Sequence, residues 1–329
     1  LLSFFLLLLL LLLLLLLLYL LLPLLLLLPP SSSSFFFLLL LLLLLRLSSV
    51  VLLQPGATAG VMVCTGTFRG HSRYVMAVAA LPASEAFPNG LVATGSLDHT
   101  INVYDPRLDD APLQVLAEHT NAVCCLAAAS DGALLSSSWD GTAKLWRDFV
   151  CMVTFKGHKG AVWRVMAHPD GLCVVTAGAD HTVKLWSLDG VCTRTLAGHT
   201  DVVRGLASLG SQQFASCAND GTVRVWSYEQ GQVMVIPAHD EYIYDMVPLA
   251  GDTGLDLATS SEDGSVKIWR GGVCVQTLVM PGKSIWCLGT RPNGDLLVGA
   301  DDGVARVFTR APSRLADPAS LAQYEELLS

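Results

Sequence analysis

Histidine and aspartate are the residues whose types and spacing could carry chemistry in this sequence of 329 residues. An imidazole paired with a carboxylate is the arrangement of a general base, and clustered imidazoles bind metal ions. Five histidines each precede an aspartate by 21 to 27 positions, namely His71 and Asp98, His119 and Asp140, His158 and Asp180, His199 and Asp220, and His239 and Asp263. A pair that recurs along the whole chain is typical of one repeated structural unit, not of a single active site.

The unit that carries each pair is about 40 residues long. Its aspartates, continued by Asp302, are separated by 42, 40, 40, 43 and 39 residues, by subtraction. Each copy has a Gly-His or its remnant, a short apolar strand, Asp-Gly-Thr or a variant, and an aromatic residue. The clearest copies run from Ser138 to Trp146 and from Asn219 to Trp226. This pattern predicts an all-β WD40 β-propeller with six recognisable blades.

In such a blade the histidine, the turn aspartate, a strand serine or threonine and the aromatic residue form one hydrogen-bonded chain. This hydrogen-bonded network stabilises the blade only if every polar group in it has a partner. Taking the serine two positions before the aspartate, two copies are complete, His119–Asp140–Ser138–Trp146 and His239–Asp263–Ser261–Trp269. The histidines are therefore interpreted as structural. Since different blades hold them about a blade-width apart, no metal site and no cofactor are expected.

The other copies depart from the full pattern. Gly178 and Ala218 occupy the serine position, so the networks that end at Trp186 and Trp226 are expected to be partial. The first copy has Tyr104 in place of tryptophan. The sixth has Phe308 there and Pro281 in place of histidine.

Motifs of catalysis are missing from the sequence. There is no Gly-x-Ser-x-Gly, no HExxH and no GxGxxG. Gly282-Lys283-Ser284 resembles the end of a phosphate-binding loop, but Thr277 stands where that loop needs its first glycine. The carboxylates fall mostly in turns, one per blade, so no close acid–base pair is implied. The protein is predicted not to be an enzyme.

A binding surface is expected where the innermost strands begin, beside the central channel. Alternate side chains of a strand project to one side, so the third and fifth residues after the histidine position should face a ligand. Aromatic residues and arginine dominate binding hot spots. The predicted surface consists of Tyr74, Met76, Trp163, Arg204, Tyr242, Tyr244 and Trp286, with Asp240 and Glu241 beside it. The alternative is that some of these side chains only line and plug the channel.

Charge and cysteine content limit the partners and the compartment. The net charge is −8 and the isoelectric point about 5.4, which disfavours binding to nucleic acid and favours a protein partner. Nine cysteines occur without a C-x-x-C pair, most of them in strand-like runs such as Cys64, Cys125, Cys192, Cys274 and Cys287. They are interpreted as buried core thiols in a reducing compartment, the cytoplasm, with the nucleus as a second location.

Three segments are predicted, a Leu-rich tract over 1–60, the propeller over 61–310 and a linker over 311–329. Residues 1–45 are Leu, Phe, Ser and Pro except for Tyr19, and these four amino acids are the ones encodable by pyrimidines alone. The tract is therefore interpreted as translated non-coding sequence. A hydrophobic membrane anchor is the alternative, although no cation precedes Arg46. Asp317-Pro318, followed by spaced leucines, predicts a short C-terminal helix.

Longer strings of residues resemble one family, that of phospholipase A-2-activating protein. They include 91–96, 137–144, 216–220, 284–287 and 293–300, and the resemblance covers about residues 62–329. It implies a ubiquitin-binding adaptor of the valosin-containing AAA unfoldase, acting in ubiquitin homeostasis and in degradation or sorting of ubiquitinated proteins. The rival function is a WD40 scaffold, including a phospholipase-activator role, that does not depend on ubiquitin.

The resemblance also implies parts that this sequence lacks. The family ring has seven blades, whereas six are recognisable here, with the Leu-rich tract where the first belongs. A second ubiquitin-binding domain and a C-terminal domain that docks the unfoldase are not in the sequence, so unfoldase recruitment is not assigned to these residues. Strand 61–68 is expected either to pair with the strand ending at Phe308 or to leave an open ring.

Overall fold

A computed structural model describes residues 50–55, 62–108, 110–251, 254–291 and 293–310, all of them within one compact unit, Phe37–Ser329. These residues form antiparallel sheets of four consecutive strands. The first two are β3 (Val75–Leu81), β4 (Leu91–Ser96), β5 (Ile101–Tyr104) and β6 (Gln114–Leu116), then β7 (Val123–Ala128), β8 (Leu134–Ser138), β9 (Thr142–Arg147) and β10 (Val150–Lys156).

Three further four-stranded sheets and one of three strands follow in the same order. They are β11 (Val162–Ala167), β12 (Val174–Gly178), β13 (Val183–Trp186) and β14 (Cys192–Leu196); β15 (Val203–Ser208), β16 (Gln213–Ala218), β17 (Thr222–Ser227) and β18 (Gly231–Pro237); β19 (Ile243–Pro248), β20 (Asp256–Ser261), β21 (Ser265–Arg270) and β22 (Val273–Val279); and β23 (Ile285–Thr290), β24 (Leu296–Ala300) and β25 (Ala305–Phe308).

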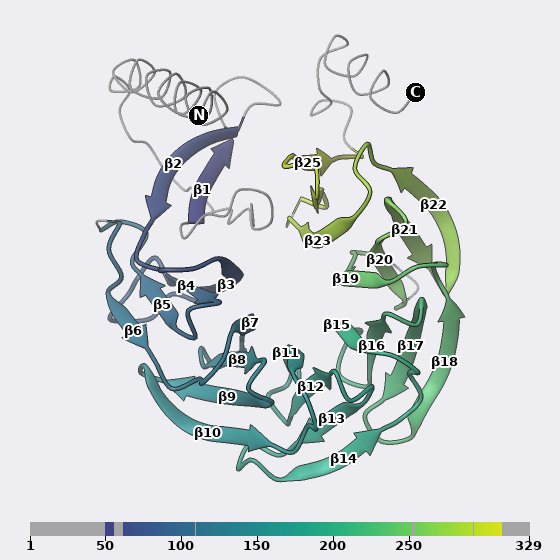
Figure 1. Cartoon of the computed structure of the whole chain (residues 1–329), viewed down its shortest axis with the longest axis horizontal. Coiled ribbons are helices and arrows are strands. Elements are labelled where there is room, and N and C mark those ends of the chain that lie inside the picture. Colours follow the sequence, from purple (N-terminus) through teal and green to yellow (C-terminus); the bar gives the residue numbers. More distant parts are fainter. Residues whose placement is uncertain (1–49, 56–61, 109, 252–253, 292, 311–329) are drawn as a thin grey trace, which may run out of the picture. The chain divides into compact units, whose positions relative to one another are not determined.

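The sheets are arranged around a common axis as the blades of a propeller (Figure 1). Residues of the innermost strands line a central channel along this axis. The first strand of each blade is innermost, and each innermost strand contacts that of the next blade, from β3 through β7, β11, β15 and β19 to β23. The predicted WD40 propeller with six recognisable blades is confirmed.

Burial follows the position of a strand within its blade. The second strands β8, β12 and β20 are buried at every residue, and their many small side chains let neighbouring sheets approach. The outermost strands β10 and β22 are mostly exposed. The apolar clusters lie between blades, and the one that contains Trp146 also contains Ile101 and Leu126. Because such contacts link each blade to the next, the ring is one packed body.

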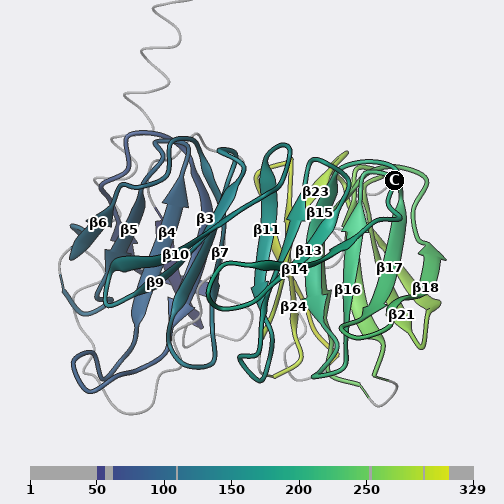
Figure 2. The same cartoon turned by 90° about the horizontal axis from the view of Figure 1, so that it is seen from below.

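The two faces of the ring are built from different loops. Figure 2 shows β4 running from the lower to the upper edge of its blade. The turn after β4, which holds Asp98, therefore lies at the upper edge, and the loop before it lies at the lower edge. The upper face accordingly carries the aspartate turns and the starts of the innermost strands. The lower face carries the loops between first and second strands and the hairpins between third and fourth strands.

The structure excludes one of the two alternatives that the sequence left open for strand 61–68. β2 (Met62–Phe68) pairs antiparallel with β1 (Val50–Pro55), with Val50 opposite Phe68 and Pro55 opposite Met62. Among the described strands β25 pairs with β24, so the predicted pairing of 61–68 with the strand ending at Phe308 is wrong. By order and pairing, β1 and β2 correspond to the outer two strands of a further blade.

Other sequence-based expectations lie outside the described residues. These are the tract 1–45, its membrane-anchor alternative and the C-terminal helix. Within the part of the chain that is described, no helix is long and apolar enough to cross a membrane.

Candidate functional site

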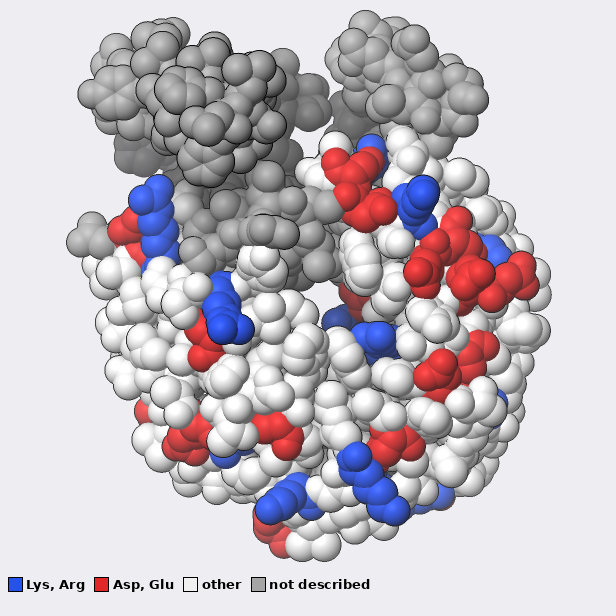
Figure 3. Space-filling model, in the orientation of Figure 1, with Lys and Arg blue, Asp and Glu red and all other residues white. Residues whose placement is uncertain are grey.

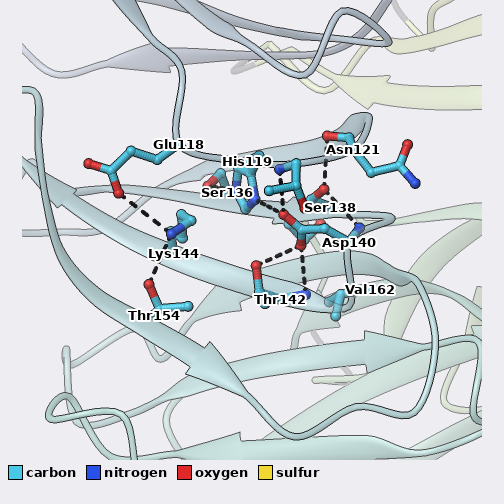
Figure 4. A network of polar contacts seen from close by, with 12 residues as sticks. Glu118, His119, Asn121, Ser136, Ser138, Asp140, Thr142, Lys144, Thr154 and Val162 are labelled. Atoms are coloured by element: carbon cyan, nitrogen blue, oxygen red, sulfur yellow. Dashed lines mark hydrogen bonds and ion pairs between the residues drawn. The ribbon is translucent and has the colours of Figure 1, made fainter.

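The histidine of each of the first five blades bonds its own turn aspartate through Nδ1, over 2.7 to 2.9 Å. In the second blade His119 Nδ1 lies 2.8 Å from Asp140, and His119 Nε2 lies 2.8 Å from Ser136 Oγ. Trp146 Nε1 donates to the same Ser136 Oγ over 2.8 Å. Figure 4 shows His119 held between Ser136 and Asp140. The predicted blade network is therefore present, and its polar groups satisfy one another.

The serine of this network is not the predicted one. Ser138 Oγ instead accepts from Asp140 N and donates to Asn121 O, and Ser261 Oγ accepts from Asp263 N. Both residues fix the aspartate turn and take no part in the link from histidine to tryptophan. In the fifth blade Thr259 makes that link, bonding His239 and Trp269.

Strand register explains the correction. Trp146 lies opposite Leu134, so the hydroxyl within its diagonal reach belongs to Ser136, two residues further along β8. Ser138 shares the same face but lies another two residues away. By the same diagonal, Thr176 links His158 to Trp186 and Ser216 links His199 to Trp226. The networks expected to be partial at Gly178 and Ala218 are therefore complete.

The first and last blades differ from the other four. His71 bonds Thr94 in the first, where Tyr104 replaces the tryptophan and donates its hydroxyl to Arg69 O. In the sixth blade the histidine and hydroxyl positions hold Pro281 and the buried Val298. Because the histidine and the hydroxyl are both replaced by apolar residues, neither replacement leaves the other group buried without a hydrogen-bond partner. Asp302 there pairs with Arg306.

Hydrogen bonding keeps the turn aspartates ionised. Burial alone would raise their pKa values, but the bonds from histidine, from the following Thr or Ser and from backbone N–H groups outweigh it. The pKa values of Asp98, Asp180 and Asp263 fall to about 2, and those of Asp140 and Asp220 fall further still. Burial also lowers the pKa of His158, so that imidazole stays neutral in the fold. The imidazoles are buried and each is paired with its aspartate, so these groups form a structural network.

The mouth of the channel on the upper face is built by one repeated irregularity. Each innermost strand has a β-bulge, and the bulged residue is the fifth after the histidine position in every blade. A bulge turns a side chain away from the regular alternation of a strand. The six bulged residues all line one cavity of about 250 Å³, and they are Met76, Cys124, Trp163, Arg204, Tyr244 and Trp286.

Five side chains of this mouth form a continuous row of ring contacts, which we call the aromatic row. Trp139 meets Trp163 edge-on with centroids 5.3 Å apart, and Tyr244 stacks on Trp286 at 4.4 Å. Arg204 joins the two pairs, with Cζ 3.9 Å from the Trp163 centroid and 5.9 Å from that of Tyr244. Such cation–π contacts hold a guanidinium in place while its edge stays available. Figure 3 shows basic and acidic atoms at the centre of the ring, and the described surface next to them is mostly uncharged.

Trp139 was missed from the sequence, although a signal for it exists. Trp139 stands directly before the turn aspartate. Its backbone N–H donates to Ala122 O, and the same backbone bond recurs in all six blades. The bond places the residue before each aspartate beside the start of the innermost strand. Asn219 occupies that position in the fourth blade and accepts from Arg204 Nε over 3.0 Å. In the fifth blade Glu262 lies there beside Tyr244, whose pKa is raised to about 12 by burial and by this carboxylate.

Beneath the aromatic row, a partly buried ion pair crosses the channel. Arg164 of β11 bonds Asp245 of β19, and Asp245 also accepts from Leu288 N of β23 over 3.0 Å. Burial alone would lower the pKa of Arg164, but the Asp245 carboxylate raises it. Arg164 and Asp245 directly follow Trp163 and Tyr244 in sequence, and Leu288 lies two residues after Trp286. The pair therefore joins the three strands that carry most of the aromatic row.

The structure brings together five of the nine predicted surface residues, namely Met76, Trp163, Arg204, Tyr244 and Trp286. Tyr74 and Tyr242 are 40% and 41% exposed and do not line the mouth, because the third position precedes the bulge. Asp240 and Glu241 are exposed on the same loop as Tyr242. These four residues could only form a rim around the mouth.

The sequence predicted that the cysteines are buried core thiols, but the structure shows that only some of them are buried. Cys125 and Cys217 are buried, but Cys192 and Cys274 are exposed on the outermost strands. An apolar run does not show which of a strand's two faces meets solvent, and an outermost strand has one exposed face. The described thiols therefore include both core and surface positions.

Comparisons with known proteins agree with this geometry. The family model "WD domain, G-beta repeat" matches residues 62–105, 110–147, 149–187, 190–227, 230–270 and 272–309. Phospholipase A-2-activating protein of Xenopus laevis is 42% identical over 262 residues, which are 79% of this chain and 32% of that protein. Ubiquitin homeostasis protein lub1 of Schizosaccharomyces pombe is 29% identical over 262 residues, 80% of this chain and 36% of that protein.

A solved structure extends the likeness to the fold. The crystal structure of the WD40 beta propeller domain of Doa1 superposes with a TM-score of 0.73 at 29% identity, covering 82% of this chain and 89% of that one. The chain spans about a third of the length of the two curated relatives. It belongs to the WD domain, G-beta repeat family, and the resemblance of its propeller to that of phospholipase A-2-activating protein is confirmed.

Proposed function

We propose that this propeller is a ubiquitin-binding adaptor module and that the aromatic row at the channel mouth is its ubiquitin-binding site. The observation that carries the proposal is the row itself, in which Trp163, Arg204, Tyr244 and Trp286 converge on one cavity. The name of the fission yeast relative, ubiquitin homeostasis protein lub1, supports ubiquitin as the partner. The compartment proposed is the cytoplasm, with the nucleus as a second location.

The chemistry of the mouth suits a partner with an apolar patch and a basic rim. Half-buried aromatic rings supply contact area at little cost in side-chain entropy, and Arg204 supplies a fixed donor among them. Asp240, Glu241 and Glu262, all of the fifth blade, place negative charge on one side of the mouth. A basic rim on the partner would meet this charge and increase the association rate more than the affinity.

A role in recruiting an AAA unfoldase, which the family resemblance implies, is proposed only for the longer relatives. About two thirds of each of those proteins lies outside the part that this chain matches. We assign no unfoldase contact to residues 50–310.

The second candidate function is a WD40 scaffold that binds some other protein through the same mouth. The name of the Xenopus laevis relative, phospholipase A-2-activating protein, favours this alternative. Both candidates use the same residues, so the identity of the bound protein separates them.

Titration of the whole chain into 15N-labelled ubiquitin, followed by NMR, tests the proposal. We expect saturable shifts at the apolar patch of ubiquitin, and their loss with Trp286→Ala or Tyr244→Ala. Leu172→Ala, at an exposed residue outside the mouth, is the matched control and should bind as the parent does. If the parent causes no shifts, or the two mouth variants bind normally, ubiquitin binding at this site is excluded and the scaffold function is favoured.

A further inference from the structure

The first blade carries the longest described loop between a first and a second strand. β3 ends at Leu81 and β4 begins at Leu91, whereas β7 ends at Ala128 and β8 begins at Leu134. The extra residues form an ordered loop. Ser84 N donates to Phe87 O, and Phe87 N donates to Ser84 Oγ. These bonds hold the half-buried Phe87 at the lower face.

The neighbouring hairpin of the second blade has a strained turn. Asp148 and Phe149 join β9 to β10 with φ values of 49° and 66°. The fifth blade makes the same two-residue hairpin between β21 and β22 with Gly271 and Gly272, at 56° and 82°. Glycine adopts positive φ without strain, whereas a bulky residue such as phenylalanine is rarely found there. The second blade thus tolerates a strained backbone that a glycine pair avoids elsewhere in the same ring.

The loop and the strained turn meet across one groove. Phe87 and Phe149 pack edge-on with centroids 6.3 Å apart. The groove, which we call the lower groove, has a volume of about 480 Å³. Its apolar lining includes Leu81, Pro82, Phe87, Leu116, Trp146 and Phe149.

Charge on the lower groove has a single sign. Among the described residues that line it, the charged ones are Asp131 and Asp148. Asp131 pairs with Arg147, while the exposed carboxylate of Asp148 makes no hydrogen bond or ion pair within the described part of the chain. An apolar groove with a carboxylate at its lip is complementary to an apolar side chain followed by a cation.

We propose that the lower groove binds a short extended segment of a partner protein, in which an aromatic or aliphatic side chain precedes a lysine or arginine. The apolar side chain packs into the groove against Phe87 and Phe149, and the cation pairs with Asp148. Strain persists where the surrounding structure and a function require it, and here it keeps the Phe149 ring over the groove. This second site lies on the face opposite the aromatic row and does not depend on ubiquitin binding.

The experiment uses the whole chain labelled with 4-fluorophenylalanine, its Phe87 and Phe149 signals assigned by Phe→Leu variants. Four Gly/Ser-flanked peptides with central Phe-Lys, Leu-Lys, Phe-Glu and Ser-Lys are titrated in. We expect saturable 19F shifts at both signals with Phe-Lys and Leu-Lys, and at least fivefold weaker binding of Phe-Glu and Ser-Lys. Asp148→Lys, an exposed change that leaves the turn and the apolar lining in place, should reverse the preference to Phe-Glu.

Two variants complete the test. Phe149→Gly gives the turn the residue type found at Gly272, and it should abolish peptide binding while the remaining 19F signals show a folded chain. Trp286→Ala, at the opposite face, should bind the peptides as the parent does. The proposal is overturned by equal or absent binding of all four peptides, by unchanged preference in Asp148→Lys, or by peptide-independent shifts that grow with protein concentration, which would identify a second copy as the occupant.

Discussion

The interior of the blades and the mouth of the channel are built from the same repeat by opposite rules. Inside the blades, four copies place the same four groups, histidine, aspartate, a hydroxyl and tryptophan, at the same spacing. At the mouth the bulge recurs in all six blades, but its residue is Met, Cys, Trp, Arg, Tyr and Trp in turn. The repeated positions hold the fold together, and the variable positions of the same strands are free to specify a partner.

The largest effect is expected where the two regions meet, at the ion pair beneath the mouth. Asp245→Ala leaves Arg164 without its carboxylate and Leu288 N without its acceptor. Removing one partner of a buried pair costs roughly 3–5 kcal/mol, and the lower end applies because the Arg164 side chain is 30% exposed. Denaturant unfolding measures the loss. The double variant Arg164→Met/Asp245→Leu should recover most of it, and a loss below about 1 kcal/mol in Asp245→Ala would show that the pair is not structural.

The next effect is a difference in lost stability between substitutions at Ser136 and Ser138, two serines of β8. Ser136→Ala removes the hydroxyl that satisfies both His119 and Trp146, and each buried group left without a partner costs about 1–3 kcal/mol. Ser138→Ala removes only turn bonds and should cost about 1 kcal/mol or less. The two free energies of unfolding are compared under identical conditions. Equal losses, or a larger loss at Ser138, would contradict the network described above.

A smaller effect is expected at Arg204, which joins the two halves of the aromatic row. Arg204→Met keeps much of the apolar contact but removes the cation–π contact and the bond to Asn219, about 1–2 kcal/mol together. Because Arg204 is proposed to contact ubiquitin, affinity should fall roughly tenfold, and calorimetric titration measures it. Unchanged affinity would remove Arg204 from the proposed site.

The smallest effect is a dependence of stability on acid pH. The folded pKa of Asp98 is about 2, below the 3.8 of the unfolded chain, so the unfolded state takes up protons first as pH falls. Its stabilising contribution is fully present above about pH 4 and is lost between that pH and about 2. Because this carboxylate is partly exposed, solvent screening reduces the effect. Asp98→Asn should flatten the fall of the unfolding free energy in this window, and an unchanged slope would contradict the assignment.

The sequence predicted the repeat, the blade boundaries and the residue at the fifth position after each histidine. These follow directly from the period of the repeated unit and from its recurring histidine, aspartate and aromatic residues. The linking hydroxyl could not be predicted, because Ser136 and Ser138 share a strand face and register alone decides which one Trp146 reaches. Trp139 was missed because the alternation of the innermost strands does not include the residue before the aspartate turn, although that position recurs with every turn aspartate. Arg164 and Asp245 are 81 positions apart in the sequence and belong to different blades, and no local pattern specifies such a contact.

The division between a structural interior and a binding mouth is tested most directly by calorimetric titration of ubiquitin into Trp286→Ala and Ser136→Ala, with unfolding free energies measured on the same samples. We predict that Trp286→Ala loses at least tenfold in affinity and about 1 kcal/mol or less in stability. Ser136→Ala should lose stability while its folded fraction binds as the parent does. Normal binding by Trp286→Ala, or parallel losses of affinity and stability in both variants, would contradict the division.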